Sequence, residues 1–178
     1  MINFENTAYL KNGNERQQAA YQVLTKHEVL SKLREFSPIL VGTIPINIDT
    51  AGSDLDIICC CPDLQNFAEA VTKSFKHERK FSIAYSAHSG KDNVAASFFL
   101  DNFEVEVFGQ STPTKEQNAY RHMLIEHRIL EQKGEDFRKQ IVALKEQGVK
   151  TEPAFAQLLG VSGDPYSGLL DFERRYNW

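Results

Sequence analysis

A run of apolar residues at positions 55–61 constrains the fold of this chain more than any other feature of its sequence. Two acidic residues, Asp54 and Asp56, stand at the beginning of the run, and Pro62 follows its end. A Gly-Ser pair before the acids completes the boundaries of a segment of strand length. A strand that is apolar on both sides is typical of the middle of a sheet covered by helices. The run therefore predicts a helix-covered sheet with two carboxylates at one end of a central strand.

Hydrophobic periodicity and turn residues divide the remaining chain into helices and further strands. Asp63 is expected to cap one helix, and Thr114 with Gln117 has the spacing of a capping box that opens another. A turn at 89–92 separates two of the strands. Helices are predicted at about 14–35, 64–75, 114–133, 136–147, 151–159 and 169–174, and strands at 39–41, 55–61, 81–87, 94–100 and 103–108.

These elements predict an α/β (α+β) fold, in which helices pack on a mixed β-sheet and further helices follow it. Residues 1–112 are expected to form the α/β core. Residues 113–178 are expected to form a C-terminal helical part that packs with the core as one unit and walls the cleft.

The composition is that of one ordinary globular domain. The chain has 178 residues, of which 42% are hydrophobic and 25% charged. Its formal charge of −4 argues against an extended nucleic-acid-binding surface. No apolar stretch approaches the roughly 18 residues of a membrane span, and the N-terminus lacks a secretory signal, so we expect a cytoplasmic protein. The three cysteines, Cys59–Cys61, are consecutive and are expected to be reduced thiols that fill the strand. His27 is expected to be a core histidine.

The two acids at the strand start point to a metal site. Residues i and i+2 of a strand project to the same side about 6.5–7 Å apart, so the carboxylates of Asp54 and Asp56 repel each other. A bound cation relieves this repulsion, and Mg²⁺ prefers oxygen ligands from carboxylates and phosphates. The alternating strand at 103–108 offers Glu104 and Glu106 as a third ligand if it pairs beside the first. We therefore expect Mg²⁺ or Mn²⁺ at this position.

Two further segments carry groups suited to phosphate. Gly42 permits a tight turn, and the Thr43 hydroxyl with nearby backbone N–H groups can hold a phosphate oxygen. On the helix after Thr114, Arg121 and Arg128 lie on one stripe with Gln117, His122, Glu126 and Gln132 on or beside it. Arginine forks match phosphate geometry, but such a stripe is equally typical of a solvated helix face.

The order apolar residue, Gly42, Thr43, about ten residues and then Asp-x-Asp resembles the signature of the DNA polymerase β-like nucleotidyltransferase superfamily. The whole chain, through segments such as 40–46, 52–57, 108–110, 121–123, 151–156 and 163–166, is similar to a bacterial family called domain of unknown function 4269.

The resemblance implies that Asp54, Asp56 and Glu104 or Glu106, preferably Glu106, bind metal ions that activate a nucleoside triphosphate. A hydroxyl of an unknown acceptor would then attack the α-phosphate. In the same model we expect Gly42, Thr43 and Ser53 to hold the nucleotide, and Arg121 and Arg128 to offset the charge of the leaving pyrophosphate.

Two other functions remain open from the sequence. The same fold could serve as a catalytically silent nucleotide-binding or regulatory module, resembling an antitoxin, with a protein partner. It could also modify a hydroxyl of a drug or metabolite. The sequence contains no Gly-x-Ser-x-Gly elbow, no Walker-type phosphate loop and no zinc-peptidase helix pattern, which leaves those three enzyme classes without support.

Overall fold

A five-stranded mixed sheet forms the centre of the molecule in the computed structural model, which describes residues 2–88 and 91–175. The strand order is β1-β2-β5-β4-β3, and among the described residues β2 and β5 form a parallel pair while the other neighbouring strands are antiparallel. The predicted α/β fold with a mixed sheet is therefore confirmed. The strands are β1 (Ile39–Val41), β2 (Leu55–Cys60), β3 (Arg79–His88), β4 (Lys91–Leu100) and β5 (Phe103–Gln110).

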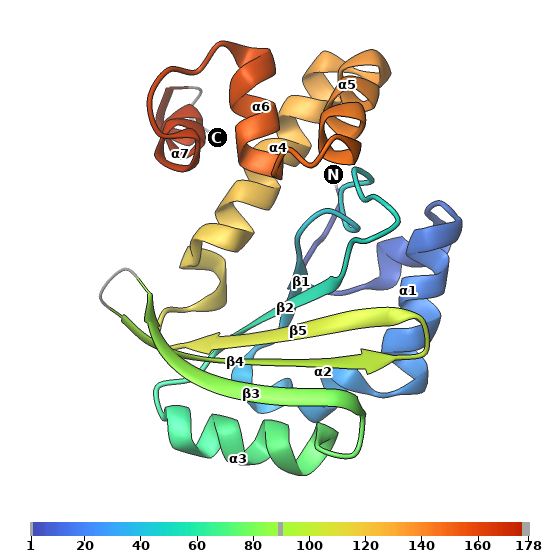
Figure 1. The fold of residues 1–178 in the computed structure, drawn as a ribbon, viewed down its shortest axis with the longest axis vertical. Coiled ribbons are helices and arrows are strands. Elements are labelled where there is room, and N and C mark those ends of the chain that lie inside the picture. Colours follow the sequence, from blue (N-terminus) through green and yellow to red (C-terminus); the bar gives the residue numbers. More distant parts are fainter. Residues whose placement is uncertain (1, 89–90, 176–178) are drawn as a thin grey trace.

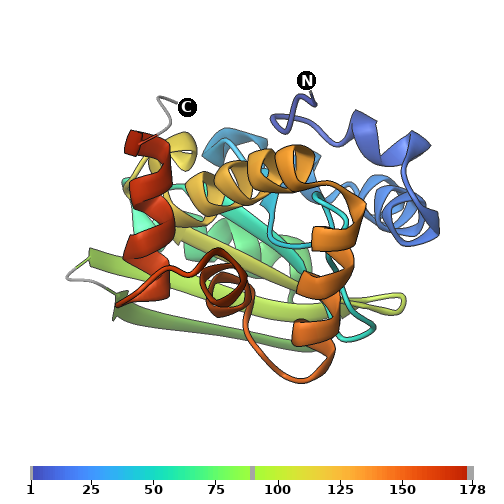
Figure 2. The ribbon, with the colours of Figure 1, turned by 90° about the horizontal axis from the view of Figure 1, so that it is seen from above.

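Helices cover the sheet on two sides. In Figure 1, α3 lies below the sheet with α1 and α2 nearby, and α4–α7 lie above it. Figure 2 shows α4–α7 spread over the upper side of the sheet. The helices are α1 (Glu15–Lys26), α2 (Val29–Lys32), α3 (Leu64–Phe75), α4 (Asn118–Lys133), α5 (Glu135–Glu146), α6 (Thr151–Leu159) and α7 (Pro165–Arg175), with 3₁₀ turns η1 (Ala8–Asn12), η2 (Arg34–Phe36) and η3 (Thr114–Glu116).

Strand β2 is buried on both sides, as its apolar run predicts. Leu55 and Ile57 belong to the hydrophobic cluster that the sheet forms with α1–α3. Ile58 points the other way and joins a second cluster, which contains Met123 of α4 and Phe155 of α6. Because successive strand residues face opposite sides, Asp54 and Asp56 share the side of Ile58. The acids therefore face the C-terminal helices.

Several local predictions are confirmed in detail. Helix α3 has the predicted bounds, and Asp63 caps it by accepting a hydrogen bond from the Asn66 backbone N–H at 3.0 Å. Its Phe67, Ala68, Val71 and Phe75 are all buried. The cysteines are free thiols in or directly after β2, with Cys59 and Cys61 buried.

Four expectations about the helices were wrong. The helix predicted at 14–35 ends at Lys26, because Glu28 has a left-handed backbone (φ 54°) and α2 starts after it. His27 is consequently at a helix end, half-exposed, with Nε2 3.4 Å from Asp101 Oδ1, and is not a core histidine. Residues Thr114–Glu116 form a 3₁₀ turn, so α4 starts at Asn118 without a capping box. The last helix starts at Pro165 rather than near position 169.

No helix among the described residues is both long and apolar enough to cross a membrane. The cytoplasmic compartment stays a prediction. Residues 89 and 90 of the predicted turn lie outside the described residues.

Candidate active site

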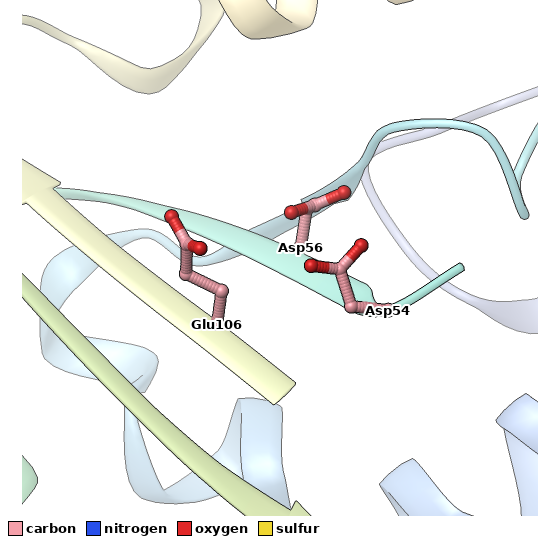
Figure 3. Close-up of side chains that lie close together, drawn as sticks. All are labelled: Asp54, Asp56 and Glu106. Carbon is pink, nitrogen blue, oxygen red and sulfur yellow. The ribbon is translucent and has the colours of Figure 1, made fainter. Parts of the chain in front are cut away.

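Three carboxylates meet on the side of the sheet that faces α4. Asp54 and Asp56 come from the start of β2, and Glu106 comes from β5 (Figure 3). Asp56 and Glu106 are direct partners in the parallel β2–β5 register. One oxygen atom from each of the three side chains lies within 4.8 Å of the others. Both glutamates of β5 are exposed, and Glu104, two residues earlier than Glu106, is not part of this group.

Gly42 makes room for one of these acids. It follows β1, whose last residue Val41 pairs with Asp56 in the antiparallel register. Gly42 has a φ of +82°, a conformation that L-residues rarely adopt. A Cβ at this position would collide with Oδ2 of Asp56 and lie 3.2 Å from its Cγ. The glycine is therefore required both by the turn and by the position of the Asp56 side chain.

Two of the three acids, Asp56 and Glu106, have a raised pKa. Burial, together with the charges of Asp54 and Glu106, raises the pKa of Asp56 to about 7. Burial, with the charges of Asp54 and Glu104, also raises the pKa of Glu106. None of the three carboxylates forms an ion pair with a lysine or arginine of the described residues. The lysines and arginines that the structure describes therefore give this group no direct counter-charge.

The loop between β1 and β2 is held in a fixed shape beside the acids. The Thr43 hydroxyl donates to Ser53 Oγ at 3.2 Å, and Ser53 Oγ accepts from the Thr50 backbone N–H at 2.9 Å. From α1, the Arg16 guanidinium donates to the Ser53 carbonyl at 2.7 Å, and from α5, Arg138 donates to the carbonyl of Asn47 at 3.1 Å. Because Ser53 directly precedes Asp54, these contacts also position the first acid.

A cleft of about 590 Å³ opens above the acids. Its floor includes Gly42, Thr43, Asp56 and Glu106, and its opposite wall is formed by η3 and the α4 and α6 helices. A cleft of this size is in the range that holds small-molecule substrates. Gln117, at the start of α4, fixes this wall to the sheet: it is 2% exposed, and its Nε2 donates to the carbonyls of Cys59 and Thr112, both at 2.9 Å.

The structure does not bring Arg121 and Arg128 to this cleft. The α4 residues that line it include His122, Met123 and Glu126. At about 100° per residue, both arginines lie more than about 120° around the helix from that face. Arg128 instead lines a hollow beside the N-terminal segment. The two arginines do lie on one helix, but their spacing in the sequence does not determine which face of α4 turns toward the acids.

A second polar group lies in the wall of the cleft: the sequence singled out its His122 and Glu126 beside the arginine stripe, but not Glu152 and Lys145. His122 lies between two acceptors: its Nε2 is 3.0 Å from the Tyr166 carbonyl and its Nδ1 is 3.4 Å from Glu152 Oε1. Glu126 is 3% exposed, and burial raises its pKa well above the usual value. The Lys145 charge acts on Glu126, Glu152 and Asp56, while burial lowers the pKa of Lys145 itself. Four separate helix positions supply this group, so no local motif could have indicated it.

The donor set of the floor fits a hard divalent cation. All three groups offer carboxylate oxygens, which Mg²⁺ and Mn²⁺ prefer, and their mutual repulsion is the feature that a dication would relieve. Because a cleft adjoins the group, further coordination positions can be taken by substrate oxygens or water.

The fold of the chain is similar to that of solved nucleotidyltransferases. Cid1, described as having RNA terminal uridylyl transferase activity, superposes with a TM-score of 0.55 at 10% identity over 78% of this chain and 45% of its own. A cytoplasmic RNA terminal U-transferase gives 0.54 at 10% identity, over 74% and 41%. GLD-2, in its complex with RNP-8, gives 0.52 at 11% identity, over 85% and 62%.

The chain belongs to the family described as domain of unknown function DUF4269, whose model matches residues 22–172. The chain spans less than two thirds of the length of each of the three solved proteins. No curated protein matches the sequence. At 10–11% identity, the likeness to the solved structures establishes the fold.

Proposed function

We propose that this protein is a metal-dependent nucleotidyltransferase that transfers a nucleoside monophosphate from a nucleoside triphosphate to a hydroxyl of an acceptor. The observation that carries the proposal is the convergence of three carboxylates within 4.8 Å of one another, two of which, Asp56 and Glu106, line a substrate-sized cleft. The alternative of a silent module predicts that the third acid is lost from the cleft. Glu106 is present in the group and favours the enzyme.

Asp54, Asp56 and Glu106 would hold Mg²⁺ or Mn²⁺. When bound, such ions polarise phosphoryl oxygens and lower the pKa of a coordinated hydroxyl. The two aspartates come from consecutive same-side positions of β2, while Glu106 approaches from the neighbouring strand, so the set spans the place where a triphosphate and an acceptor would meet.

The phosphates are assigned to the turn at Gly42 and Thr43, with Ser53 bracing the Thr43 hydroxyl. A left-handed glycine turn exposes backbone N–H groups that can bind anionic oxygens. Arg121 and Arg128 do not line the cleft and are not assigned to the phosphates. Lys145 donates to Thr151 Oγ1 in the cleft wall at 3.2 Å, and its charge acts on Asp56.

The reaction is a displacement at the α-phosphorus. The acceptor oxygen forms a bond to the α-phosphorus, and the bond from that phosphorus to the oxygen bridging to the β-phosphorus breaks. Pyrophosphate leaves with the bonding electrons, and the hydroxyl proton passes to water. The protein's contribution is to position the two reacting oxygens and to stabilise the charge that develops between them.

Calorimetry with Mn²⁺ and a non-hydrolysable nucleoside triphosphate tests the proposal. The wild type should bind the pair together, and Asp54→Asn, Asp56→Asn or Glu106→Gln should weaken Mn²⁺ binding more than about tenfold, because each removes an anionic ligand. Glu104→Gln is the matched control, since this acid lies on the same strand outside the group. Equal Mn²⁺ and nucleotide binding by the wild type and the three variants would refute the function.

A further inference from the structure

Asp54 is held differently from the other two acids of the carboxylate group. Asp56 and Glu106 are partners in the parallel β2–β5 ladder, whose first pair is Leu55 with Val105. Asp54 stands one residue before that pair, and it also lies outside the β1–β2 ladder, which reaches only as far as Asp56. Strand pairing therefore fixes two of the acids, and other contacts must fix the third.

The side chain of Arg16, on α1, contacts both strands at this end of the ladder. One guanidinium nitrogen donates to the Ser53 carbonyl at 2.7 Å, and the guanidinium carbon lies 4.6 Å from the centre of the Phe103 ring. Carried two positions back from its first pair, the β2–β5 register places Ser53 opposite Phe103. A guanidinium can lie on an aromatic ring and still donate hydrogen bonds in its own plane. Arg16 therefore spans the two positions that a longer ladder would pair.

The start of α1, from which Arg16 projects, is itself fixed to the loop before Asp54. A capping box between Asn14 and Gln17 orders the first turn of the helix. Gln17 is buried, and its Nε2 donates to the Ile44 carbonyl at 2.9 Å. The Nε of Arg16 lies 3.6 Å from Asp49 Oδ2, which restrains the guanidinium from another side. A side chain that is already ordered by its surroundings can order its neighbours at little further cost in entropy.

We propose that Arg16 is a positioning residue, whose guanidinium extends the connection between β2 and β5 past the first pair of the ladder. By holding Ser53 against Phe103, it fixes the distance of the Asp54 carboxylate from the other two acids. Arg16 contacts neither the metal nor the substrate in this role and acts only through Asp54. The inference rests on the proposed function, because the carboxylate group is the metal site of that function.

The charge of Arg16 and its positioning role would change the affinity for a dication in opposite directions. A positive charge near the acids repels Mn²⁺, so the loss of the charge alone would strengthen binding. An Asp54 that is no longer held must be ordered by the metal itself, so the loss of the positioning contact would weaken binding. The sign of the change therefore separates the two effects.

A double-mutant cycle on Mn²⁺ affinity tests the inference. The electron paramagnetic resonance signal of free Mn²⁺ measures binding by the wild type, Arg16→Ala, Asp54→Asn and the double variant. We expect Arg16→Ala to weaken binding about tenfold in the wild-type background, as the loss of a group that orients a ligand does. In the Asp54→Asn background, the same substitution should change the affinity less than about twofold, because the residue through which it acts is already altered.

Two further variants serve as controls. Arg138→Ala removes another guanidinium that donates to carbonyls of the same loop, at Ile46 and Asn47. Any change in Mn²⁺ affinity that it causes should be equal in both backgrounds. Arg16→Lys keeps the positive charge but loses the planar group that reaches the carbonyl and the ring together. We expect it to weaken Mn²⁺ binding about threefold or more, and wild-type affinity in this variant would contradict the bridging role.

Hydrogen exchange of the metal-free protein gives a readout that does not depend on Mn²⁺. Peptides that contain residues 53–55 should exchange faster in Arg16→Ala than in the wild type, because the Ser53 carbonyl loses this donor. Arg138→Ala should show its increase around residues 46–47 instead. If Arg16→Ala does not fold, Phe103→Leu takes its place: it removes the ring contact, keeps an apolar side chain and should weaken Mn²⁺ binding only when Asp54 is present.

The outcomes separate this inference from the proposed function. If the wild type binds no Mn²⁺, the proposed function fails, and exchange at residues 53–55 alone decides whether Arg16 holds this segment. If the wild type binds Mn²⁺ with nucleotide but Arg16→Ala strengthens Mn²⁺ binding, or weakens it equally in both backgrounds, the function stands and the role of Arg16 is refuted. Unchanged exchange at residues 53–55 in Arg16→Ala refutes it as well.

Discussion

Replacing Gly42 by alanine tests the geometry of the candidate active site most directly. The substitution adds one methyl group at a position with φ +82° and directs it at the Asp56 carboxylate. Gly148 offers a matched control, because it has a similar φ of +89° but no atom lies within 4 Å of a Cβ built there. The pair separates the backbone cost of leaving glycine from the cost of the collision.

The expected magnitudes follow from these two environments. An L-residue in the left-handed region costs about 1–2 kcal/mol, which is the whole effect expected for Gly148→Ala. Forcing a methyl group into an occupied space costs about 1–3 kcal/mol more. We therefore expect Gly42→Ala to lower the free energy of unfolding by about 2–5 kcal/mol. The displaced Asp56 carboxylate should also weaken Mn²⁺ binding, whereas Gly148→Ala should leave that binding unchanged.

Urea denaturation, analysed for both midpoint and slope, measures the stability change, and calorimetry measures Mn²⁺ affinity. The reasoning is refuted if Gly42→Ala and Gly148→Ala destabilise the protein equally. It is also refuted if Gly42→Ala binds Mn²⁺ as tightly as the wild type, because Asp56 would then not depend on the absence of that Cβ.

Three further predictions concern residues around the cleft. Gln117→Ala removes the hydrogen bonds to the carbonyls of Cys59 and Thr112 and should lower the free energy of unfolding by about 2–3 kcal/mol, whereas Gln132→Ala, exposed on the same helix, should change it little in urea denaturation. Because burial raises the pKa of Glu126, the carboxyl group keeps its proton to a higher pH in the folded state than in the unfolded state. The free energy of unfolding should therefore fall as the pH rises from about 4.5 through the folded pKa. Glu126→Gln should flatten this dependence in unfolding curves at pH 5 and pH 8. Thr43→Val removes the hydrogen bond to Ser53 and should lower the free energy of unfolding by about 1 kcal/mol in urea denaturation. Thr43→Ser keeps the hydroxyl and should retain most of this stability.

The strands and the amphipathic helices could be predicted because their signals are local. The apolar run of β2 indicated a central strand, and Asp63 indicated the start of α3. The break after Lys26 could not be predicted, since Glu28 takes a left-handed conformation without the glycine that usually marks one. The start of α7 had a signal that the prediction did not use: Asp164 accepts a hydrogen bond from the Ser167 backbone N–H at 2.8 Å, and the proline after it suits the first helical position.

The site was predictable only in part. The spacing of Asp54 and Asp56 placed both carboxylates on one side of β2, and the alternation of β5 placed Glu104 and Glu106 on one side of that strand. The choice between the two glutamates depends on the β2–β5 register, which pairs Glu106 with Asp56 and which no local pattern encodes. The positions of Arg121 and of the wall residue Glu126 depend in the same way on how α4 is rotated against the sheet.

The parallel seam between β2 and β5 has a consequence for how the molecule assembles. Strands β3, β4 and β5 follow one another as antiparallel neighbours and can form a meander from residues close in sequence. In contrast, the residues that pair between β2 and β5 are about fifty positions apart. Pairing β2 with β5 joins two parts of the fold that can form separately. The same pairing brings the acidic side chains of the two strands together. We expect this late step to limit the refolding rate, and divalent cations to accelerate refolding by screening the repulsion as the two pieces meet.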